Sequence, residues 1–439
     1  MSDSEPTQAA CSFCGTPKTA ETPLISGNNG MICEGCVQLA YQVVSSWGVK
    51  KQTAEMINSL KTPAEIKSHL DSYVIGQQEA KETLSVAVYN HYMRLLNQGA
   101  DEALLQGDSD TELEKSNVLM AGPSGTGKTL LVKSLAKVIG VPIVVADATT
   151  LTQAGYVGDD VDTVLLRLLE AADGDVKKAE WGIVYIDEID KLARAGAGMA
   201  AVRDVSGEGV QQSLLKMVEG CQVSLSKGDK RQQQGGGGKE VSLDTTHILF
   251  IVGGAFPGLT KIVSERVQPS SAGIGFHAKN IKGEQDKKSN NELFALLQPE
   301  DFQQFGIIPE FIGRFPIITY LEELDIDSLL RILQEPKNAL VKQYQQLFKY
   351  QGVELNFTET ALCRIAQKAL DRGTGARGLR SIMESVLRRT MFDLPSKNNI
   401  GKCIVDEDTV NDAAEFIVEE ILGTNGLNEA EQENQQVAL

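Results

Sequence analysis

The chain has 439 residues, with 42 Lys and Arg against 59 Asp and Glu, so its formal net charge is −17. This length suggests roughly two to four domains. The hydrophobic share of 42% is typical of folded proteins and excludes a largely disordered chain. No apolar run approaches the roughly 18 residues of a transmembrane helix, so we expect no membrane span. The acidic balance argues against a broad electrostatic grip on nucleic acid, and the first residues lack a secretory signal, so we expect a cytoplasmic location.

Two pairs of cysteines stand near the start of the chain. Cys11 and Cys14 form the first pair, Cys33 and Cys36 form the second, and 18 residues separate the pairs. This spacing is typical of a zinc site in which two tight turns each present two thiolates to the ion. Four sulfur ligands leave no open position, so we expect a structural Zn²⁺ in a module over residues 1–47. Free cysteines or a redox pair are the alternative.

A polar linker is expected over residues 48–61, and a second domain over residues 62–322. The domain begins at a capping box, Thr62-Pro-Ala-Glu65. From residue 117 onward, short apolar runs alternate with amphipathic segments, which predicts an α/β fold with a parallel sheet flanked by helices. The expected strands are 117–121, 142–146, 182–186 and 247–252, and the Gln- and Gly-rich residues 226–240 are expected to form a flexible loop.

The strongest chemical signal is the sequence Gly-Pro-Ser-Gly-Thr-Gly-Lys-Thr at residues 122–129. It matches a phosphate-binding P-loop in full and lies between an expected strand and an expected helix over residues 129–139, as such a loop requires. Backbone N–H groups of the loop and the helix N-terminus attract phosphate. We therefore predict ATP binding, with Lys128 on the β- and γ-phosphates and Thr129 on Mg²⁺. The predicted nucleotide-binding residues of the loop are Gly122, Pro123, Ser124, Gly125, Thr126, Gly127, Lys128 and Thr129.

A later apolar strand ends in two carboxylates, Asp187 and Glu188. Mg²⁺ needs an acidic ligand at a strand tip near Thr129, and we expect Asp187 to supply it. Glu188 is expected to polarise the attacking water, which makes the site hydrolytic. Taken alone, a strand followed by Asp-Glu is as often an ordinary exposed strand end. The P-loop upstream favours the catalytic interpretation.

A smaller, mainly helical domain is expected over residues 323–422. Residues 325–393 have helical patterns, and residues 402–405 have the pattern of a strand. From Asn411 to the end there are seven acidic residues and no basic ones. This composition predicts a solvated tail, which we assign as acidic and flexible over residues 423–439.

The strand, P-loop and helix with the Asp-Glu-Ile-Asp strand end resemble the AAA+ superfamily. Four further segments and the four-cysteine module resemble the ClpX-type unfoldases within it. The segments are Gly155-Tyr-Val-Gly158, Arg203-Asp-Val-Ser-Gly-Glu-Gly209, Gly306-Ile-Ile-Pro-Glu-Phe-Ile-Gly-Arg314 and Gly375-Ala-Arg-Gly-Leu-Arg380. The resemblance covers nearly the whole chain and weakens in the first ten residues and after about Asp408. HslU-type unfoldases share several core motifs but lack the cysteine module, so they are the weaker match.

For the nucleotide site, the resemblance implies three further contributions. Arg314 looks like an arginine finger that reaches the γ-phosphate of a neighbouring subunit, and Arg377 looks like a sensor-2 arginine that contacts nucleotide in its own subunit. A permanently charged planar group suits both roles. Val74 and Ile75 lie in a segment similar to the one that packs against the adenine in this family.

The resemblance also implies contacts with other polypeptides. Tyr156 and Val157, which lie between glycines, resemble the pore-1 loop that grips substrate, and Arg203 opens a segment similar to the pore-2 loop. The residues that match the loop for docking onto a ClpP-type peptidase are Ile274, Gly275 and Phe276. By pattern alone, the alternative for the Tyr156 segment is an ordinary Gly-flanked turn. The alternative for the docking segment is a loop anchor that is packed into the protein's own core.

Two departures from the family pattern limit the prediction. Residues 227–232 keep basic charge but lack the His of the family's Arg-Lys-His triplet, so no tag preference follows. The strand end Phe250-Ile-Val-Gly-Gly254 offers no polar side chain where many AAA+ proteins place a sensor-1 residue. We therefore assign no sensor-1 residue.

These features together predict an ATPase that unfolds proteins and feeds a separate peptidase. The resemblance implies a homohexameric ring, a ClpP-type peptidase, and unfolded or tagged substrates and adaptors as partners, with the zinc module capturing the substrates. Nothing resembles a protease nucleophile. A remodelling chaperone that works without a peptidase is one alternative, and a DNA-handling AAA+ ATPase is the weaker one.

Overall fold

The computed structural model describes ten stretches of the chain. They are residues 10–19, 22–40, 60–98, 113–152, 159–193, 207–226, 240–267, 289–396, 400–411 and 417–420. The chain divides into two compact units, residues 1–60 with 92–113 and residues 61–91 with 114–439. In the described helices, no segment is long and apolar enough to cross a membrane.

The first unit contains a small antiparallel hairpin. Strand β1 (Leu24–Ser26) pairs with β2 (Met31–Cys33), and the N–H of Gly27 closes the turn on the carbonyl of Gly30 at 2.8 Å. Residues 34–40 are helical and follow β2 directly. Cys11 is the single buried residue among the described residues 10–40, so the hairpin lacks a hydrophobic core of its own.

The second unit is built on a five-stranded sheet in which every pairing is parallel. The strand order is β11-β3-β10-β7-β4. The strands are β3 (Val118–Ala121), β4 (Ile143–Asp147), β7 (Ile183–Asp187), β10 (Leu249–Gly254) and β11 (Ile317–Tyr320). The first four lie within two residues of the predicted bounds, whereas β11 was not predicted.

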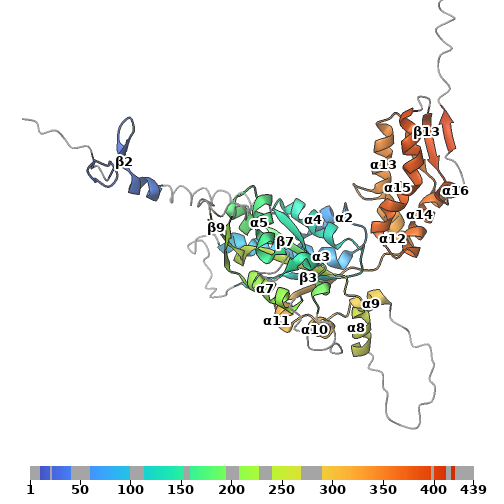
Figure 1. The fold of residues 1–439 in the computed structure, drawn as a ribbon, viewed down its shortest axis with the longest axis horizontal. Helices are drawn as coiled ribbons and strands as arrows, with labels where there is room; N and C mark the ends of the chain where they lie inside the picture. Colours follow the sequence, from blue (N-terminus) through green and yellow to red (C-terminus); the bar gives the residue numbers. More distant parts are fainter. Residues whose placement is uncertain are drawn as a thin grey trace, which may run out of the picture. The chain divides into compact units, whose positions relative to one another are not determined.

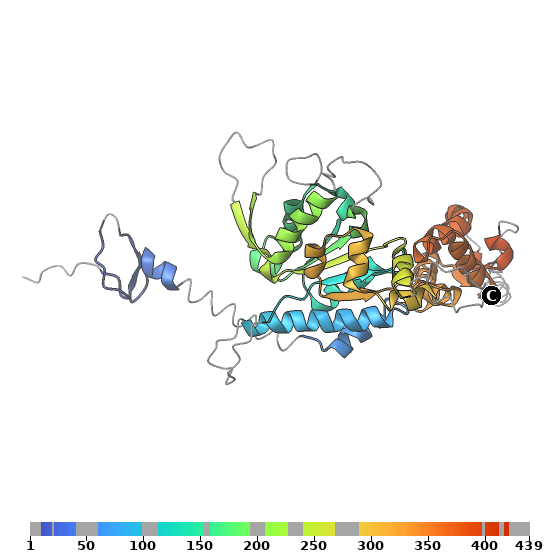
Figure 2. The same ribbon diagram turned by 90° about the horizontal axis from the view of Figure 1, so that it is seen from below.

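Helices cover both faces of the sheet (Figures 1 and 2). One face, with Val184 and Ile186 of β7, packs against α5 (Val161–Ala171) and α7 (Glu208–Glu219) in a single apolar core. Because side chains alternate along a strand, Tyr185 and Asp187 point to the opposite face. Helix α4 (Lys128–Ile139) contacts β7 and β4 there, and α2 (Pro63–Asp71) packs on α4.

Local signals explain where these two helices begin and end. At the start of α2, the predicted capping box is confirmed: the Glu65 N–H donates to Thr62 Oγ1 at 3.4 Å, and the Thr62 N–H donates to Glu65 Oε2 at 2.8 Å. Helix α4 ends at Gly140, whose φ of +79° is left-handed and easily adopted by glycine.

The remaining elements of the large domain connect and extend this sheet. Its further helices are α3 (Gln78–Gln98), which spans the boundary between the units, α6 (Val176–Glu180), α8 (Leu259–Val267), α9 (Asn290–Phe294), α10 (Pro299–Phe305) and α11 (Pro309–Gly313). Short strand pairs are β5 (Leu151–Thr152) with β6 (Asp159–Asp160) and β8 (Gln222–Ser226) with β9 (Glu240–Asp244). Single 3₁₀ turns are Ala148–Thr150, Ile189–Leu192 and Thr245–His247.

The C-terminal part has its own apolar core, which is separate from that of the large sheet. Its helices are α12 (Ile326–Gln334), α13 (Leu340–Lys349), α14 (Glu359–Asp371), α15 (Ala376–Asp393) and α16 (Glu407–Val410), with a 3₁₀ turn at Leu394–Ser396. A three-stranded sheet joins β12 (Glu354–Phe357), β13 (Ile400–Val405) and β14 (Ile417–Glu420).

Two expectations for this part need correction. The stretch 325–393 is not purely helical, because β12 interrupts it. The segment after Asn411 does not begin as a solvated tail, because Ile417–Glu420 pairs with β13 as an edge strand. The predicted fold class is confirmed: an α/β parallel sheet flanked by helices, a smaller mainly helical C-terminal domain and an N-terminal four-cysteine module.

Candidate functional site

The P-loop lies at the carboxyl end of β3 and runs into α4. Gly125 and Gly127 have φ values of +81° and +102°, which are strained for any residue with a Cβ. These turns wrap the backbone around the N-terminus of α4, where free N–H groups and the helix dipole attract anions. The backbone therefore fits a phosphate chain without any side-chain contribution.

Lys128 is folded over this loop. Its Nζ donates to the carbonyls of Gly122 at 2.6 Å and Pro123 at 2.9 Å. Burial lowers the pKa of Lys128 to about 8, although the carboxylates of Asp187 and Asp190 act in the opposite direction. The two carbonyls are neutral and compensate the charge of the Lys128 ammonium only in part. An anionic phosphate would compensate it fully.

Thr129 and Asp187 meet across the gap between α4 and β7. The hydroxyl of Thr129 donates to Oδ2 of Asp187 at 2.7 Å. Hydroxyl and carboxylate oxygens are the hard ligands that Mg²⁺ prefers. The pair thus fits the magnesium ion that accompanies ATP.

Glu188 follows β7 in a strained conformation. Its φ of +57° and ψ of +32° are left-handed, which is uncommon for a residue other than glycine. Its N–H donates to Oδ1 of Asp187 at 3.0 Å. Backbone strain of this kind is maintained mainly at functional sites.

Two buried polar residues beside this site were not predicted. Asp190 accepts from the N–H of Ala255 at 3.0 Å through Oδ1, and Oδ2 has no hydrogen-bond partner among the described residues. The side chain of Tyr185 is fully buried, and burial together with the nearby Asp187 carboxylate raises its pKa. Asp190 is the last residue of the Asp-Glu-Ile-Asp motif, so the motif could have pointed to it. For Tyr185, the signal was its alternation with Asp187 along β7.

Arg377 lies at the start of α15 and reaches the P-loop. Its Nη1 donates to Oγ of Ser124 at 3.3 Å, and the N–H of Ala376 donates to the carbonyl of Gly125 at 3.3 Å. A Cβ on Gly125 would come within 2.7 Å of the Thr374 carbonyl, so only glycine permits this approach. The structure thus brings the predicted sensor-2 arginine beside the predicted phosphate site.

Val74 and Ile75 are buried next to the same loop. Val74 Cγ1 lies 4.0 Å from the position of a Cβ on Gly127. The buried Lys81 holds the segment in place, because its Nζ donates to the Val74 carbonyl at 2.6 Å and to Asp71 Oδ1 at 2.7 Å. The segment predicted to contact adenine therefore lies against the P-loop.

Arg314 stands apart from all of these residues. Its carbonyl accepts from Nδ2 of Asn117 at 2.9 Å, at the amino end of β3, and its guanidinium binds Oε1 of Glu219 at 2.6 and 3.0 Å. The P-loop begins at the carboxyl end of the same strand, about 13 Å farther along. The structure therefore does not bring Arg314 to the nucleotide site of its own chain.

Six predicted site residues lie outside the described residues. They are Tyr156, Val157, Arg203, Ile274, Gly275 and Phe276. Most of the Gln- and Gly-rich stretch also lies outside, with Ser226 ending β8 and Glu240 beginning β9 on either side of it.

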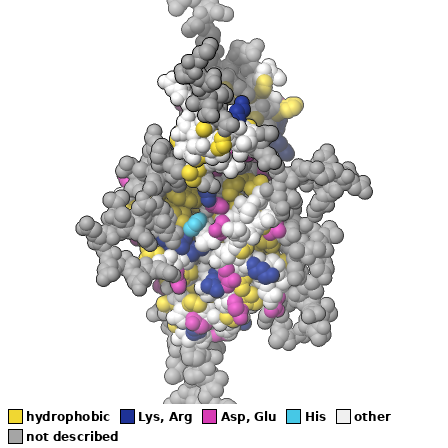
Figure 3. Space-filling model, turned by 90° about the vertical axis from the view of Figure 1, so that its left-hand side faces the viewer, with side chains coloured by type: hydrophobic (Ala, Val, Ile, Leu, Met, Phe, Trp, Pro, Cys, Tyr) yellow, Lys and Arg dark blue, Asp and Glu magenta, His cyan; other side chains and the backbone are white. Residues whose placement is uncertain are grey.

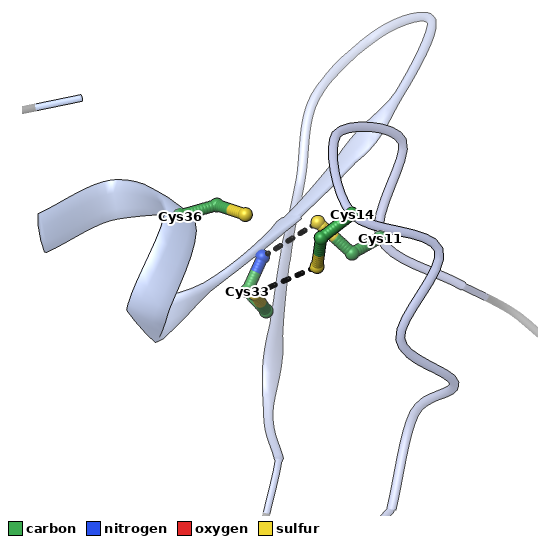
Figure 4. A group of neighbouring side chains, drawn as sticks. All are labelled: Cys11, Cys14, Cys33 and Cys36. Atoms are coloured by element: carbon green, nitrogen blue, oxygen red, sulfur yellow. Dashed lines mark hydrogen bonds between the residues drawn. The ribbon is translucent and has the colours of Figure 1, made fainter. Parts of the chain in front are cut away.

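The four cysteines of the first unit converge (Figure 4). Their Sγ atoms all lie within 4.8 Å of one another, and those of Cys14 and Cys33 are 3.5 Å apart. Zn–S bonds of about 2.3 Å place the sulfurs of a tetrahedral site about 3.8 Å apart. The arrangement therefore fits one zinc ion.

The charges of these thiols also fit a cation. The backbone N–H of Cys14 is the main group that lowers the pKa of Cys11, to about 6, and the hydroxyl of Thr16 lowers the pKa of Cys14. Neighbouring sulfurs, Cys14 above all, raise the pKa of Cys36 to about 12. Three or four adjacent thiolates repel one another unless a cation lies between them.

Three family models match the chain. The AAA domain (Cdc48 subfamily) matches residues 113–318, the ClpX C4-type zinc finger matches residues 9–46, and the C-terminal, D2-small domain of ClpB protein matches residues 324–406. The zinc-finger match covers the four converging cysteines and supports Zn²⁺ as the ion that they bind.

Curated relatives match over nearly the whole length. The ATP-dependent Clp protease ATP-binding subunit ClpX of Azotobacter vinelandii is 61% identical over 396 residues, which cover 90% of this chain and 88% of the relative. The chain belongs to the ClpX family. The subunit named ClpX 3 from Methylococcus capsulatus is 58% identical, with 92% and 93% covered, and ClpX of Treponema denticola is 46% identical, with 92% and 94% covered. As a ClpX family member with an AAA domain, this protein is an ATPase.

Proposed function

We propose that this ClpX family member is an ATP-driven protein unfoldase and translocase. It recognises tagged substrates, directly or through adaptors, unfolds them through the central pore of a homohexameric ring, and delivers them to a ClpP-type peptidase in the cytoplasm. The relatives from Azotobacter vinelandii and Treponema denticola are named ATP-binding subunits of the ATP-dependent Clp protease, which supports a separate peptidase partner.

The observation that carries the proposal is the separation of Arg314 from the nucleotide site. Thr129 and Asp187 meet at the carboxyl ends of the strands, whereas Arg314 is tied to the amino end of β3. A cation that stabilises phosphoryl transfer must lie beside the γ-phosphate. Arg314 can do so only at the site of another subunit, so the ATPase is expected to require a ring.

Within each subunit, the chain's own groups divide the work. ATP supplies a phosphoanhydride bond whose hydrolysis releases energy. The loop N–H groups and Lys128 hold its phosphates, Thr129 and Asp187 hold Mg²⁺, and Arg377 adds positive charge from the small domain. Glu188 orients and deprotonates the attacking water. Because α15 carries Arg377 and contacts the P-loop at Gly125, hydrolysis is expected to move the small domain.

The residues proposed to act on protein partners are those for which the family resemblance is the support. Tyr156, Val157 and Arg203 would grip the substrate in the pore. The peptidase contacts would be Ile274, Gly275 and Phe276. A bulky aromatic between glycines can contact any side chain without sequence preference, and an Ile/Phe pair in a polar, Gly-containing segment suits an apolar pocket on a partner.

The DNA-handling alternative receives little support from the charges. DNA binding needs a clustered basic surface, and the formal net charge is −17. On the face shown in Figure 3, Lys and Arg side chains lie interspersed with Asp and Glu side chains. A protein substrate is the better match to such a surface.

The test follows a stable fluorescent protein with an unstructured tail, incubated with the full chain, ATP and Mg²⁺, with and without a ClpP-type peptidase. We expect irreversible loss of fluorescence only when both ATP and the peptidase are present. Loss with ATP alone would favour the remodelling chaperone. ATP turnover without any loss, together with salt-sensitive binding of a DNA duplex, would overturn the proposal in favour of DNA handling.

A further inference from the structure

The carboxyl end of β10 presents no side chain toward the nucleotide site, because residues 253 and 254 are both glycine. The space beside Gly253 is nevertheless filled. A Cβ at Gly253 would lie 2.2 Å from the hydroxyl oxygen of Tyr185 and 2.9 Å from its Cζ. The hydroxyl of Tyr185, from the neighbouring strand β7, thus occupies the place that a side chain of residue 253 would take.

This hydroxyl is buried and lacks a partner. The side chain of Tyr185 has 0% exposure, and its oxygen has no partner at full hydrogen-bonding geometry in the described part of the chain, although Asp187 and Thr129 lie close enough to affect its pKa. Buried hydroxyls without a partner are uncommon and destabilising, so such a group calls for an explanation. One explanation is an acceptor that comes within reach only when the ligand binds.

The location indicates which partner that is. Tyr185 precedes Asp187 by two residues on the same strand, so both side chains point to the face on which α4 packs. The Asp187 carboxylate already accepts from the Thr129 hydroxyl and from the Glu188 N–H. Each carboxylate oxygen can accept a second hydrogen bond, so capacity remains for a further donor on Asp187 or on a water beside it.

We propose that Tyr185 is a positioning residue of the ATPase site. When nucleotide and Mg²⁺ are bound, its hydroxyl donates to Asp187, directly or through one water, and thereby orients the carboxylate that would hold the ion. The arrangement requires Gly253, because any side chain there would displace the phenol. The proposal rests on the proposed role of Asp187 as a magnesium ligand.

The test uses the full chain with Tyr185→Phe, which removes only the hydroxyl. The measurement is binding of a fluorescent ADP analogue as a function of Mg²⁺ concentration, and again in EDTA. We expect the half-saturating Mg²⁺ concentration to rise at least about tenfold, with binding in EDTA unchanged. The thermal midpoint without nucleotide should stay the same or rise, because an unpartnered buried hydroxyl is lost.

Thr319→Val is the matched control. Thr319 also carries a buried hydroxyl without a partner among the described residues, but it lies on β11, at the edge of the sheet beyond β3. Its loss should leave the Mg²⁺ dependence unchanged. Gly253→Ala pushes the phenol aside and should therefore raise the half-saturating Mg²⁺ concentration, as Tyr185→Phe does.

Asp187→Asn separates the two levels of the argument. One outcome is that Asp187→Asn raises the half-saturating Mg²⁺ concentration while Tyr185→Phe keeps the wild-type value. The inference about Tyr185 is then overturned, and the magnesium role of Asp187 stands. If Asp187→Asn has no effect either, the proposed magnesium site itself is wrong.

Discussion

Thr129 and Asp187 are 58 residues apart in the chain and 2.7 Å apart in space. Each was predicted from its own motif, a P-loop and an acidic strand end. Their contact depends on β7 lying near α4 in the sheet, which neither motif contains. The strained Glu188 beside them shows the same division, because its identity was predictable and its left-handed backbone was not.

Glu188→Gln should preserve nucleotide binding and abolish turnover. The amide keeps the size of the side chain but cannot accept a proton from water, and losing a general base lowers a rate by about 10²- to 10⁴-fold. Nucleotide affinity by fluorescence titration should change less than about threefold, a shift below about 0.7 kcal/mol. Glu170→Gln, an exposed change on α5, is the control. Normal hydrolysis by Glu188→Gln would remove Glu188 from the mechanism.

The Asp71–Lys81 pair holds the segment predicted to contact adenine. Lys81 is 1% exposed, and burial lowers its pKa even though Asp71 Oδ1 lies 2.7 Å away. Burial acts to raise the pKa of Asp71, but the ammonium groups of Lys81 and Lys67 together outweigh it and hold that pKa below its usual value. The pair therefore adds little net stability and mainly positions Val74, as is common for buried ion pairs.

Asp71→Asn should lower the free energy of unfolding near neutral pH by about 1 kcal/mol, a modest value because Asp71 is partly exposed. A carboxyl whose pKa is lower in the folded state stabilises above its unfolded pKa and loses this contribution as the pH falls. The difference from wild type in urea unfolding should therefore be constant above about pH 5 and shrink below about pH 4. A difference that does not change with pH would contradict the assignment. Lys261→Met, which breaks an exposed pair of 3.9 Å with Glu265, should have no measurable effect.

At the scale of elements, the β1–β2 hairpin with its four cysteines and the five-stranded sheet are stabilised differently. Cys11 is the single buried residue among those described between residues 10 and 40, whereas the strands β3, β7 and β10 are almost wholly buried. The large apolar side chains of Phe13, Ile25 and Leu39 are exposed by 76%, 62% and 62%. So small a unit without an apolar core depends on its metal for folding.

Cys33→Ser should therefore remove the zinc and unfold the hairpin. We expect bound zinc, measured by elemental analysis, to fall from about one ion per chain to near zero. Amide exchange of residues 24–33 should become as fast as in an unfolded peptide. Cys363→Ser, at an exposed cysteine of α14 outside the cluster, should retain its zinc. A protected hairpin in zinc-free Cys33→Ser protein would show that the metal is dispensable.

Strand β11 shows what an element-by-element reading misses. Ile317–Tyr320 is a short run that begins three residues after Arg314, and no local feature distinguishes it from a buried loop. It becomes a strand because β3 offers a free edge, so that Ile317 to Tyr320 pair in parallel with Val118 to Ala121. That pairing also places Arg314 at the amino end of the sheet.

At the scale of the whole molecule, the separation of Arg314 from the P-loop leads to a mixing experiment. Arg314→Ala subunits keep Glu188, and Glu188→Gln subunits keep Arg314, so each should be nearly inactive alone. In mixed rings, an Arg314→Ala site beside a Glu188→Gln neighbour has both groups. Equal mixing should restore activity at about a quarter of the interfaces, measured as ATP turnover. If rings that are shown to contain both variants recover no ATP turnover, Arg314 does not act in trans.

The sequence by itself determined the chemistry and the family. The P-loop, the Asp-Glu strand end and the four cysteines are local patterns whose spacing reflects the ligand, so they are readable without a fold. Only the tertiary structure decided that the Tyr185 hydroxyl stands in the place of a side chain at Gly253, and that Arg314 lies at the opposite end of the sheet from Lys128. Both depend on the strand order β11-β3-β10-β7-β4, because pairing between distant segments is set by packing and not by local periodicity.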